Sequence, residues 1–355
     1  MTSRANVNGV ARLQEQIKAI QQREAIVDQK LLETSRLIDQ QSMAAVEEFP
    51  LDPNGVITSE EPEQVQEWTE QLKDFFSVDD RCGGRCQQTW PRYIEKAYPW
   101  MLGWSLEAML VALLIRTHHH RRNGRCWLQY LEVFAGKGNL SRAAIEAGLQ
   151  GASLDIEMNQ DHDILQAYGL KLLLSCLTAT VAGALLWVAT PCSTFVILSS
   201  SVCKRTFENQ YLGDIQRYCV QEGNVLADLS GLVLLLGFLL SLKDGMEQPS
   251  SSVMPCTPAI RAVLEYIGGR KTETFHFNFG APTLKPLQLW SSCPYMTRMK
   301  RDRPSVACIE ASALAEKDQT SGGFTGRKEL LKESQEYTLE FGRSVISALL
   351  EARRP

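Results

Sequence analysis

A regular alternation of short apolar segments with helix-like segments runs through the middle of the chain and limits it to one class of fold. The segments WLQYLEVFAG (residues 127–136), GASLDI (151–156) and ALLWVATP (184–191) have the short, β-branched or aromatic character of buried strands. NLSRAAIEAGL (139–149) separates the first two and is typical of a helix. Strands that alternate with helices predict an α/β fold, with a doubly wound, mostly parallel sheet covered by helices on both faces.

The sequence before this alternation predicts an N-terminal helical extension. Residues 1–46 are polar and helix-prone, with apolar residues in a heptad spacing that is broken twice. A short coiled coil that mediates self-association through residues 10–45 and a solitary helix or partly disordered tail are both open. Residues 47–65 are turn-rich and acidic, which predicts a linker. Residues 66–123 predict a helical cap, and residues 124–355 form the main domain.

Composition bounds the class of protein and its partners. The 355 residues are 44% hydrophobic and 22% charged, which is typical of a globular protein with a substantial core. The formal net charge of −4 does not support nucleic acid as a partner, although a local basic patch leaves that partner open. The longest apolar run, residues 229–242, is shorter than the roughly 20 residues that a bilayer requires, so we expect a buried helix and no membrane span.

The cysteines and the N-terminus indicate the compartment. The ten cysteines lack the regular spacing of a disulfide framework and are expected to be reduced thiols. The N-terminus has no apolar segment of the secretory type, so we expect a cytoplasmic or nuclear protein that is not secreted. Cys82 and Cys86, with the histidines 118–120, do not have the spacing of a tetrahedral zinc site, and no metal is predicted.

A glycine-rich turn follows the first predicted strand. Phe134, Gly136 and Gly138 lie between that strand and the next helix, where glycine lets a ligand approach the main chain. Asp155 ends the second predicted strand, where an acidic side chain typically holds ribose hydroxyls. A plain glycine turn beside a surface acid is the alternative. Ser141 stands where a dinucleotide motif has its third glycine, which favours S-adenosylmethionine over NAD.

A proline–cysteine turn follows the third predicted strand. Pro191 and Cys192 stand at the carboxyl end of that strand, where doubly wound folds place reactive groups. A cysteine there is a nucleophile if a cation or a helix N-terminus stabilises its thiolate; otherwise it is a small residue in a tight turn. Lys204 and Arg205 are candidates for a phosphate contact, with a solvated basic pair as the alternative.

A carboxylate, Glu247, follows the long apolar run. In the same pocket it could grip an N–H beside a ring nitrogen or serve as a general acid. The alternative is that Glu247 caps a turn before Pro249.

Taken together, these motifs resemble the DNA cytosine-C5 methyltransferase family, from about Leu128 to Trp290. The resemblance implies a Rossmann-like domain with S-adenosyl-L-methionine as cofactor. It assigns cofactor binding to Phe134, Gly136, Gly138, Asp155, Asp163 and Pro191. It also implies that Cys192 attacks carbon 6 of a cytosine, that Glu247 holds the ring edge, and that carbon 5 takes the methyl group. The base has to be single-stranded or flipped into the pocket.

The chain departs from the family at several positions. Ser193 follows Cys192 where the family has glutamine, and Lys285 is the only cation where the family has paired arginines after the segment Phe279-Gly280-Ala281-Pro282. About 65 residues follow Trp290, too few for a target-recognition region that buries roughly 1,000 Å² or more. A methyltransferase of proteins or small molecules, and an inactive cofactor-binding or interaction module, therefore stay open as alternatives.

Overall fold

The computed structural model describes residues 63–77, 84–305, 315–317, 324–326 and 336–352. The chain divides into two units, Met1–Glu47 and Glu48–Pro355. The first unit lies outside the described residues, and so does the coiled coil predicted for residues 10–45. All the described elements belong to the second unit.

A six-stranded sheet forms the centre of the second unit. Its strands are β1 (Leu128–Val133), β2 (Gly151–Leu154), β3 (Thr180–Val188), β4 (Lys243–Pro249), β5 (Arg270–Phe275) and β6 (Pro286–Ser291). The α-helices are α2 (Glu63–Ser77), α3 (Arg85–Ala97), α4 (Leu106–Arg122), α5 (Asn139–Glu146), α6 (Ala167–Thr178), α7 (Ser200–Cys203), α8 (Tyr218–Leu239), α9 (Pro258–Tyr266) and α12 (Leu339–Ala352). Two short strands, β7 (Ala315–Lys317) and β8 (Phe324–Gly326), pair with each other in a separate ribbon.

The strand order of the sheet is β2-β1-β3-β4-β6-β5. Strands β2, β1, β3 and β4 run parallel, whereas β6 is antiparallel to both of its neighbours, β4 and β5. The predicted α/β class is confirmed, but the sheet is mixed rather than mostly parallel. The connection between β5 and β6, residues 276–285, contains only a 3-10 turn, η5 (His276–Phe279). A parallel neighbour needs a crossover of a dozen or more residues, so this short connection sends β6 back along β5.

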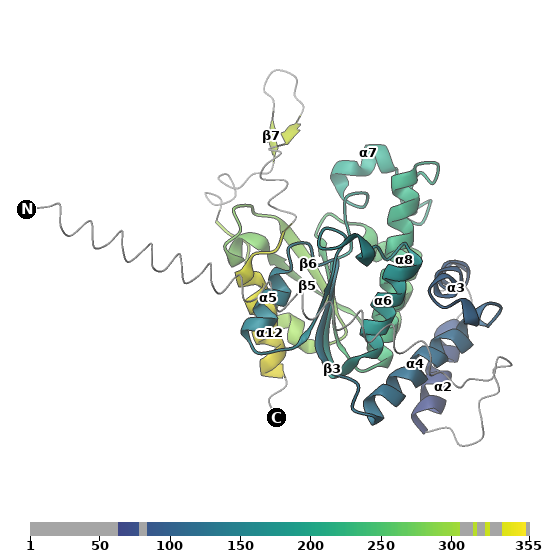
Figure 1. The fold of residues 1–355 in the computed structure, drawn as a ribbon. Helices are drawn as coiled ribbons and strands as arrows, with labels where there is room; N and C mark the ends of the chain where they lie inside the picture. The colour runs from purple at the N-terminus through teal and green to yellow at the C-terminus, as the bar shows by residue number, and fades with distance from the viewer. Residues whose placement is uncertain (1–62, 78–83, 306–314, 318–323, 327–335, 353–355) are drawn as a thin grey trace, which may run out of the picture. The chain divides into compact units, whose positions relative to one another are not determined.

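Helices lie on both sides of the sheet. Figure 1 shows α5 and α12 on one side and α6 and α8 on the other. Helix α12 packs against α5, and α8 packs against β3, β4 and α9. Strand β1 is buried along almost its whole length, as expected for a strand covered on both faces.

Trp187 fixes the packing on the side of the sheet that carries α5 and α12. This residue pairs in register with Gly245 of β4, and a Cβ atom at Gly245 would lie 2.7 Å from the indole ring. The glycine therefore leaves room for the ring. The indole meets Phe341 of α12 edge-on, with ring centroids 5.9 Å apart, and is fully buried.

Helix α8 is the buried helix predicted from the apolar run. It is apolar around its whole circumference, which is typical of a helix surrounded by protein. Among the described residues it is the one helix with the length and composition to cross a bilayer, and 83% of its apolar window is buried inside the protein.

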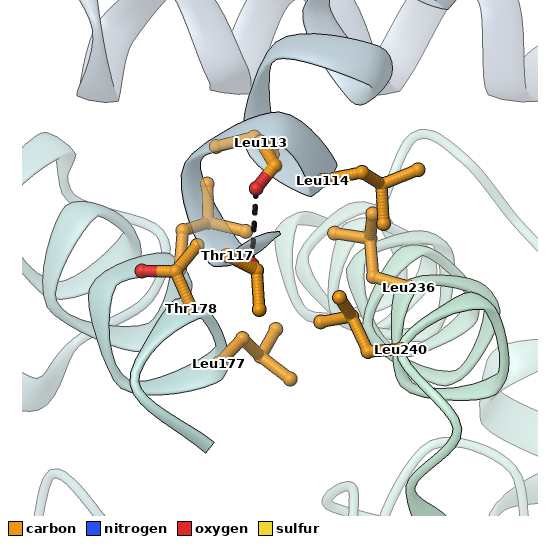
Figure 2. A pocket seen from close by; sticks show the side chains of 8 residues that line it. Leu113, Leu114, Thr117, Leu177, Thr178, Leu236 and Leu240 are labelled. Carbon is orange, nitrogen blue, oxygen red and sulfur yellow. Dashed lines mark hydrogen bonds between the residues drawn. The ribbon is translucent and has the colours of Figure 1, made fainter. Parts of the chain in front are cut away.

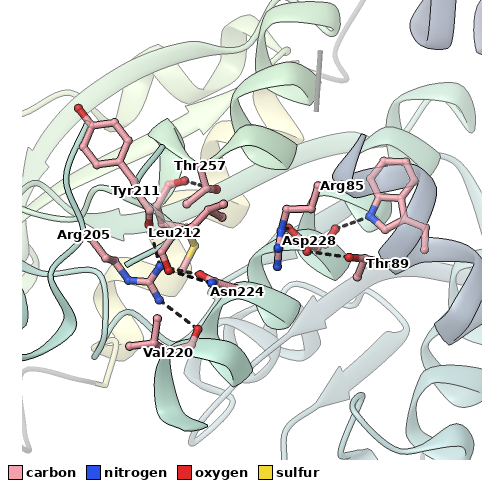
Figure 3. Close-up of polar contacts among 11 residues, drawn as sticks. Arg85, Thr89, Arg205, Tyr211, Leu212, Val220, Asn224, Asp228 and Thr257 are labelled. Carbon is pink, nitrogen blue, oxygen red and sulfur yellow. Dashed lines mark hydrogen bonds and ion pairs between the residues drawn. The ribbon is translucent and has the colours of Figure 1, made fainter. Parts of the chain in front are cut away.

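Helices α2, α3 and α4 occupy the region where a helical cap was predicted, although α2 already begins at Glu63, inside the predicted linker of residues 47–65. Buried indole groups attach these helices to α8. The indole N–H of Trp68 donates to the main-chain oxygen of Leu239 (2.9 Å) and that of Trp90 to the main-chain oxygen of Asp228 (2.8 Å). Arg85 forms an ion pair with the Asp228 carboxylate at 2.7 Å (Figure 3).

Candidate functional site

The carboxyl ends of β2, β1 and β3 are level with one another, and β4 passes the same row and continues to Pro249. Leu154, Val133, Val188 and Met246 occupy one row across β2, β1, β3 and β4. The residues that follow this row are, in the same order, Asp155, Phe134, Ala189 and Glu247. Strand β2 lies on one side of β1, and the next strand in the chain, β3, lies on the other side. Open α/β sheets bind ligands at the carboxyl ends of strands where the strand order changes direction in this way. The predicted site residues therefore begin at one edge of the sheet.

The glycine loop after β1 has a backbone that few side chains tolerate. Phe134, Gly136 and Gly138 have φ angles of 63°, 53° and 67°. Positive φ is easy for glycine but strained for an aromatic residue, and such strain concentrates at ligand sites. The main-chain N–H groups of Phe134 and Ala135 both donate to the Leu154 oxygen, at 2.8 and 3.2 Å. These bonds to β2 hold the strained turn in place.

Asp155 ties the glycine loop to the end of β2. Its Oδ2 accepts a hydrogen bond from the Gly136 N–H at 2.8 Å, and its Oδ1 accepts one from the Glu157 N–H at 2.7 Å. A carboxylate has about four acceptor positions, so each oxygen retains capacity for a ribose hydroxyl. Ile156 and Met158, which follow Asp155 in the sequence, are exposed apolar residues. A carboxylate with free acceptor positions and two exposed apolar side chains thus lie close together in the chain.

Asp163 lies in the segment that follows. Its Oδ1 accepts a hydrogen bond from the Leu165 N–H at 3.0 Å. The residue before it, His162, is buried and accepts a hydrogen bond on Nδ1 from the Asp155 N–H at 3.3 Å. His162 therefore links Asp155 to the segment that carries Asp163, and no sequence motif marks this histidine.

The loop that carries Pro191 and Cys192 is anchored through the residue before them. The amide of Gln248 donates to the Thr190 main-chain oxygen at 2.7 Å, and the Thr190 hydroxyl is 2.6 Å from the Ser230 hydroxyl of α8. Gln248 is completely buried, and its own Oε1 accepts a hydrogen bond from Ser252 at 2.8 Å. The turn is therefore braced from β4 and from α8, which places Cys192 beyond β3 with little freedom.

Cys192, Lys285 and Glu247 are close enough to influence one another. Burial raises the pKa of the Cys192 thiol, the Lys285 ammonium lowers it and the Glu247 carboxylate raises it again. The Lys285 ammonium, just before β6, opposes the effect of burial, but burial dominates and the pKa of the thiol is raised overall. The predicted nucleophile, carboxylate and cation therefore lie within electrostatic range of one another.

The Glu247 carboxylate has one occupied and one open oxygen. Tyr337 donates a hydrogen bond from its hydroxyl to Oε2 at 2.9 Å. The ammonium of Lys285 lies 3.8 Å from Oε1, and both side chains are nearly buried. Within the described part of the chain, Oε1 accepts no hydrogen bond. Oε1 is therefore a buried acceptor without a donor, and such a group is a candidate for a hydrogen bond from a ligand.

The Arg205 guanidinium donates its hydrogen bonds to groups within the protein and is not a phosphate ligand. Figure 3 shows its guanidinium directed at Tyr211, Val220 and Asn224, and it donates to Tyr211 O at 2.8 Å and to Asn224 Oδ1 at 2.6 Å. It also donates to the main-chain oxygen and hydroxyl of Thr194 and lies 3.7 Å from the centre of the Phe195 ring. The expectation of a phosphate contact is wrong for Arg205, because the fold uses its donors. Lys204 is exposed and lies 3.7 Å from Asp214.

An apolar cavity lies away from this site. Figure 2 shows it between α4, α6 and α8, lined by leucine side chains with Thr117 and Thr178. Its volume of about 10 Å³ is at the lower limit for one water molecule, and its walls are almost wholly apolar. It is a packing defect rather than a binding site.

The described residues contain no cluster of three or more His, Cys, Asp or Glu side chains that could hold a metal. Cys82, which belongs to the Cys-x3-Cys pattern, lies outside them. Cys86 is disulfide-bonded, so the expectation of reduced thiols throughout the chain is wrong for this residue. The free thiols among the described residues are Cys126, Cys176, Cys192, Cys203, Cys219, Cys256 and Cys293.

No protein-family model and no curated protein matches this chain.

Proposed function

We propose that this chain is an S-adenosyl-L-methionine-dependent methyltransferase that transfers a methyl group to carbon 5 of a cytosine in nucleic acid. One observation supports this most directly. Glu247 and Lys285 approach to 3.8 Å and both influence the Cys192 thiol, at the edge of the sheet that also carries the glycine loop tied to Asp155. The strand order and the helices on both sides are compatible with the Rossmann-like, doubly wound domain that the resemblance implies.

The residues around the glycine loop fit the proposed cofactor. Gly136 leaves open space where a Cβ atom would stand, so a ligand can approach the main chain. The Asp155 carboxylate retains acceptor capacity for ribose hydroxyls, and the exposed Ile156 side chain offers an apolar surface to an adenine. When bound, S-adenosylmethionine supplies an electrophilic methyl group on a sulfonium. Asp163 is the candidate for the adenine edge, and Pro191 for the boundary between cofactor and substrate.

The remaining chemistry belongs to the protein. Cys192 loses its proton, which the Lys285 ammonium favours against the effect of burial, and the thiolate adds to carbon 6 of the ring and makes carbon 5 nucleophilic. Glu247 accepts an N–H of the ring edge on Oε1 and holds carbon 6 against Cys192, while the neighbouring Lys285 ammonium stabilises the negative charge that the thiolate brings into the ring. After carbon 5 has taken the methyl group, it loses its proton to a base, the carbon–sulfur bond to Cys192 breaks, and the ring double bond is restored.

Isothermal titration calorimetry with S-adenosylmethionine tests the cofactor first. Gly136→Asp places a charged side chain in the loop and abolishes binding. Gly148→Asp is the matched control, because Gly148 also has a positive φ (80°) and open space around it but lies at the end of α5. Binding to the wild type and the control, together with its loss in Gly136→Asp, supports the assignment. No binding to the wild-type chain contradicts it, and the inactive interaction module then becomes the better explanation.

Transfer of a radiolabelled methyl group to a single-stranded cytosine oligonucleotide tests the chemistry. Cys192→Ala loses transfer and retains cofactor binding, whereas Cys219→Ala removes an exposed thiol and retains both. Full activity of Cys192→Ala overturns the nucleophile assignment. Transfer to protein or to small molecules by the same preparation overturns the substrate class alone.

A further inference from the structure

Tyr337 connects two buried groups of the candidate site. The Trp187 indole N–H lies 3.4 Å from the Tyr337 hydroxyl oxygen, and that hydroxyl lies 2.9 Å from Oε2 of Glu247. An indole N–H can only donate, and an ionised carboxylate can only accept. The phenol oxygen therefore accepts from Trp187, and the phenol hydrogen is donated to Glu247.

The position of the Tyr337 ring is set by aromatic contacts. The ring stacks on Phe341 with centroids 4.8 Å apart and an interplanar angle of 20°. Trp187 and His276 meet it edge-on, at 6.2 Å and 6.4 Å. The hydroxyl is therefore presented to Glu247 by a ring that is held from three sides.

The same segment also contacts the glycine loop and the start of α5. Asn139, the first residue of α5, donates from its side chain to the Tyr337 main-chain oxygen at 2.6 Å. Glu336 forms an ion pair with Lys137, inside the loop, at 2.5 Å. Residues 336–337 therefore contact the glycine loop through one set of atoms and Glu247 through the Tyr337 hydroxyl.

From this geometry we infer that Tyr337 is a positioning residue, which occupies Oε2 of the Glu247 carboxylate and leaves Oε1, beside Lys285, as the oxygen that accepts a hydrogen bond from the substrate. This inference rests on the proposed function. With Oε2 occupied by the phenol, the substrate N–H binds at Oε1, which lies 3.8 Å from the Lys285 ammonium. Without the hydroxyl the carboxylate rotates and presents either oxygen, so fewer enzyme–substrate complexes have the reactive geometry.

The test is the kinetics of methyl transfer by Tyr337→Phe, which keeps the ring, its stacking and the main-chain bond from Asn139. We expect kcat to fall about 10- to 100-fold, the effect of one hydrogen bond to a charged group, while the Kd for S-adenosylmethionine changes less than about twofold. The matched control is Tyr295→Phe. The buried Tyr295 hydroxyl donates to Asp244 O at 3.2 Å, at the opposite end of β4, and its removal leaves kcat unchanged.

A double-mutant cycle separates positioning from a general structural role. Because Tyr337 acts through Glu247, Tyr337→Phe in a Glu247→Gln background lowers kcat no further than Glu247→Gln alone. The inference is overturned if the double variant lowers kcat by the product of the two single effects. It is also overturned if Tyr337→Phe has the same kcat as the control Tyr295→Phe. Loss of cofactor affinity in Tyr337→Phe also overturns it, because the hydroxyl then supports the fold. A wild-type chain that binds the cofactor and methylates no cytosine overturns the proposed function itself, and this inference with it.

Discussion

Glu132 of β1 accepts two hydrogen bonds from Ser141 of α5, one from the main-chain N–H at 2.9 Å and one from the hydroxyl at 2.5 Å, both on Oε2. The carboxyl group is completely buried, and its Oε1 has no hydrogen-bond partner among the described residues. These two residues lie on either side of the glycine loop, Glu132 in β1 and Ser141 in α5. Their contact therefore fixes the separation of the strand and the helix that the loop connects.

We predict that replacement of the Glu132 carboxyl group changes the free energy of unfolding by an amount that depends on pH. Burial raises the pKa of Glu132 to about 7, against the lowering effect of the bonds from Ser141. A raised carboxyl pKa means that the folded state binds the proton more tightly, so stability is highest below the unfolded pKa near 4.5 and falls until the pH passes 7. Glu132→Gln retains an acceptor for Ser141 and cannot ionise. Its free energy of unfolding relative to wild type therefore rises by up to about 3 kcal/mol between pH 5 and pH 8.

Urea unfolding at a series of pH values measures this difference. The matched control is Glu265→Gln, an exposed glutamate on α9, for which the change stays within about 0.5 kcal/mol at each pH. A Glu132→Gln effect that does not depend on pH would show that Glu132 remains ionised in the folded protein across this range.

For His276 we predict the opposite pH dependence of the free energy of unfolding. Its ring is buried, neither ring nitrogen has a hydrogen-bond partner among the described residues, and burial together with Lys285 lowers its pKa to about 3. Only the unfolded chain binds a proton between pH 6.5 and 3, so this histidine lowers stability as the pH falls, by about 1.4 kcal/mol per unit. His276→Leu has a similar volume and removes that slope. Thermal or urea unfolding between pH 7 and 5 measures it, with His119→Leu as the exposed control. An unchanged slope contradicts the prediction.

We predict that a positive charge at position 205 is not sufficient to stabilise the segment after Cys192. Arg205→Lys keeps the positive charge, but an ammonium cannot reproduce the planar fork that bonds Thr194, Tyr211 and Asn224. We expect a loss of about 2–4 kcal/mol in the free energy of unfolding and faster proteolytic cleavage within residues 204–217. Lys204→Ala, at the exposed neighbouring position, changes stability by less than about 0.5 kcal/mol. Wild-type stability of Arg205→Lys would show that the internal bonds contribute little.

The local elements of the fold were predictable because their signals are local. The strand predicted at residues 127–136 is β1, the helix at 139–149 is α5, and the apolar run lies largely in α8. Alternation of side chains and their apolar character report the environment of a single segment, and neighbouring residues carry that information. The turn residues Gly136 and Gly138 were recognisable for the same reason, since glycine is the residue that most readily adopts a positive φ.

The partners within the site were not predictable in the same way. The Tyr337 hydroxyl bonds Glu247 from 90 residues away, and no motif near Tyr337 indicates this. Gln248 is buried and braces the turn before Cys192, which its own neighbours in the sequence do not reveal. Arg205 had the sequence signature of a surface cation and is instead buried. In each case the role depends on which distant group packs against the side chain.

Sequence patterns predicted the α/β class, the ends of the first three strands and the residues that follow them, including Asp155 and Cys192. Each of these follows from short-range patterning, which constrains a segment before it meets any other. The tertiary structure alone decided that β6 runs antiparallel between β4 and β5, and that Lys285 consequently faces Glu247. Strand order and side-chain pairing arise from contacts between segments far apart in the chain. Their free energy exists only once the core has formed, so no local pattern can encode it.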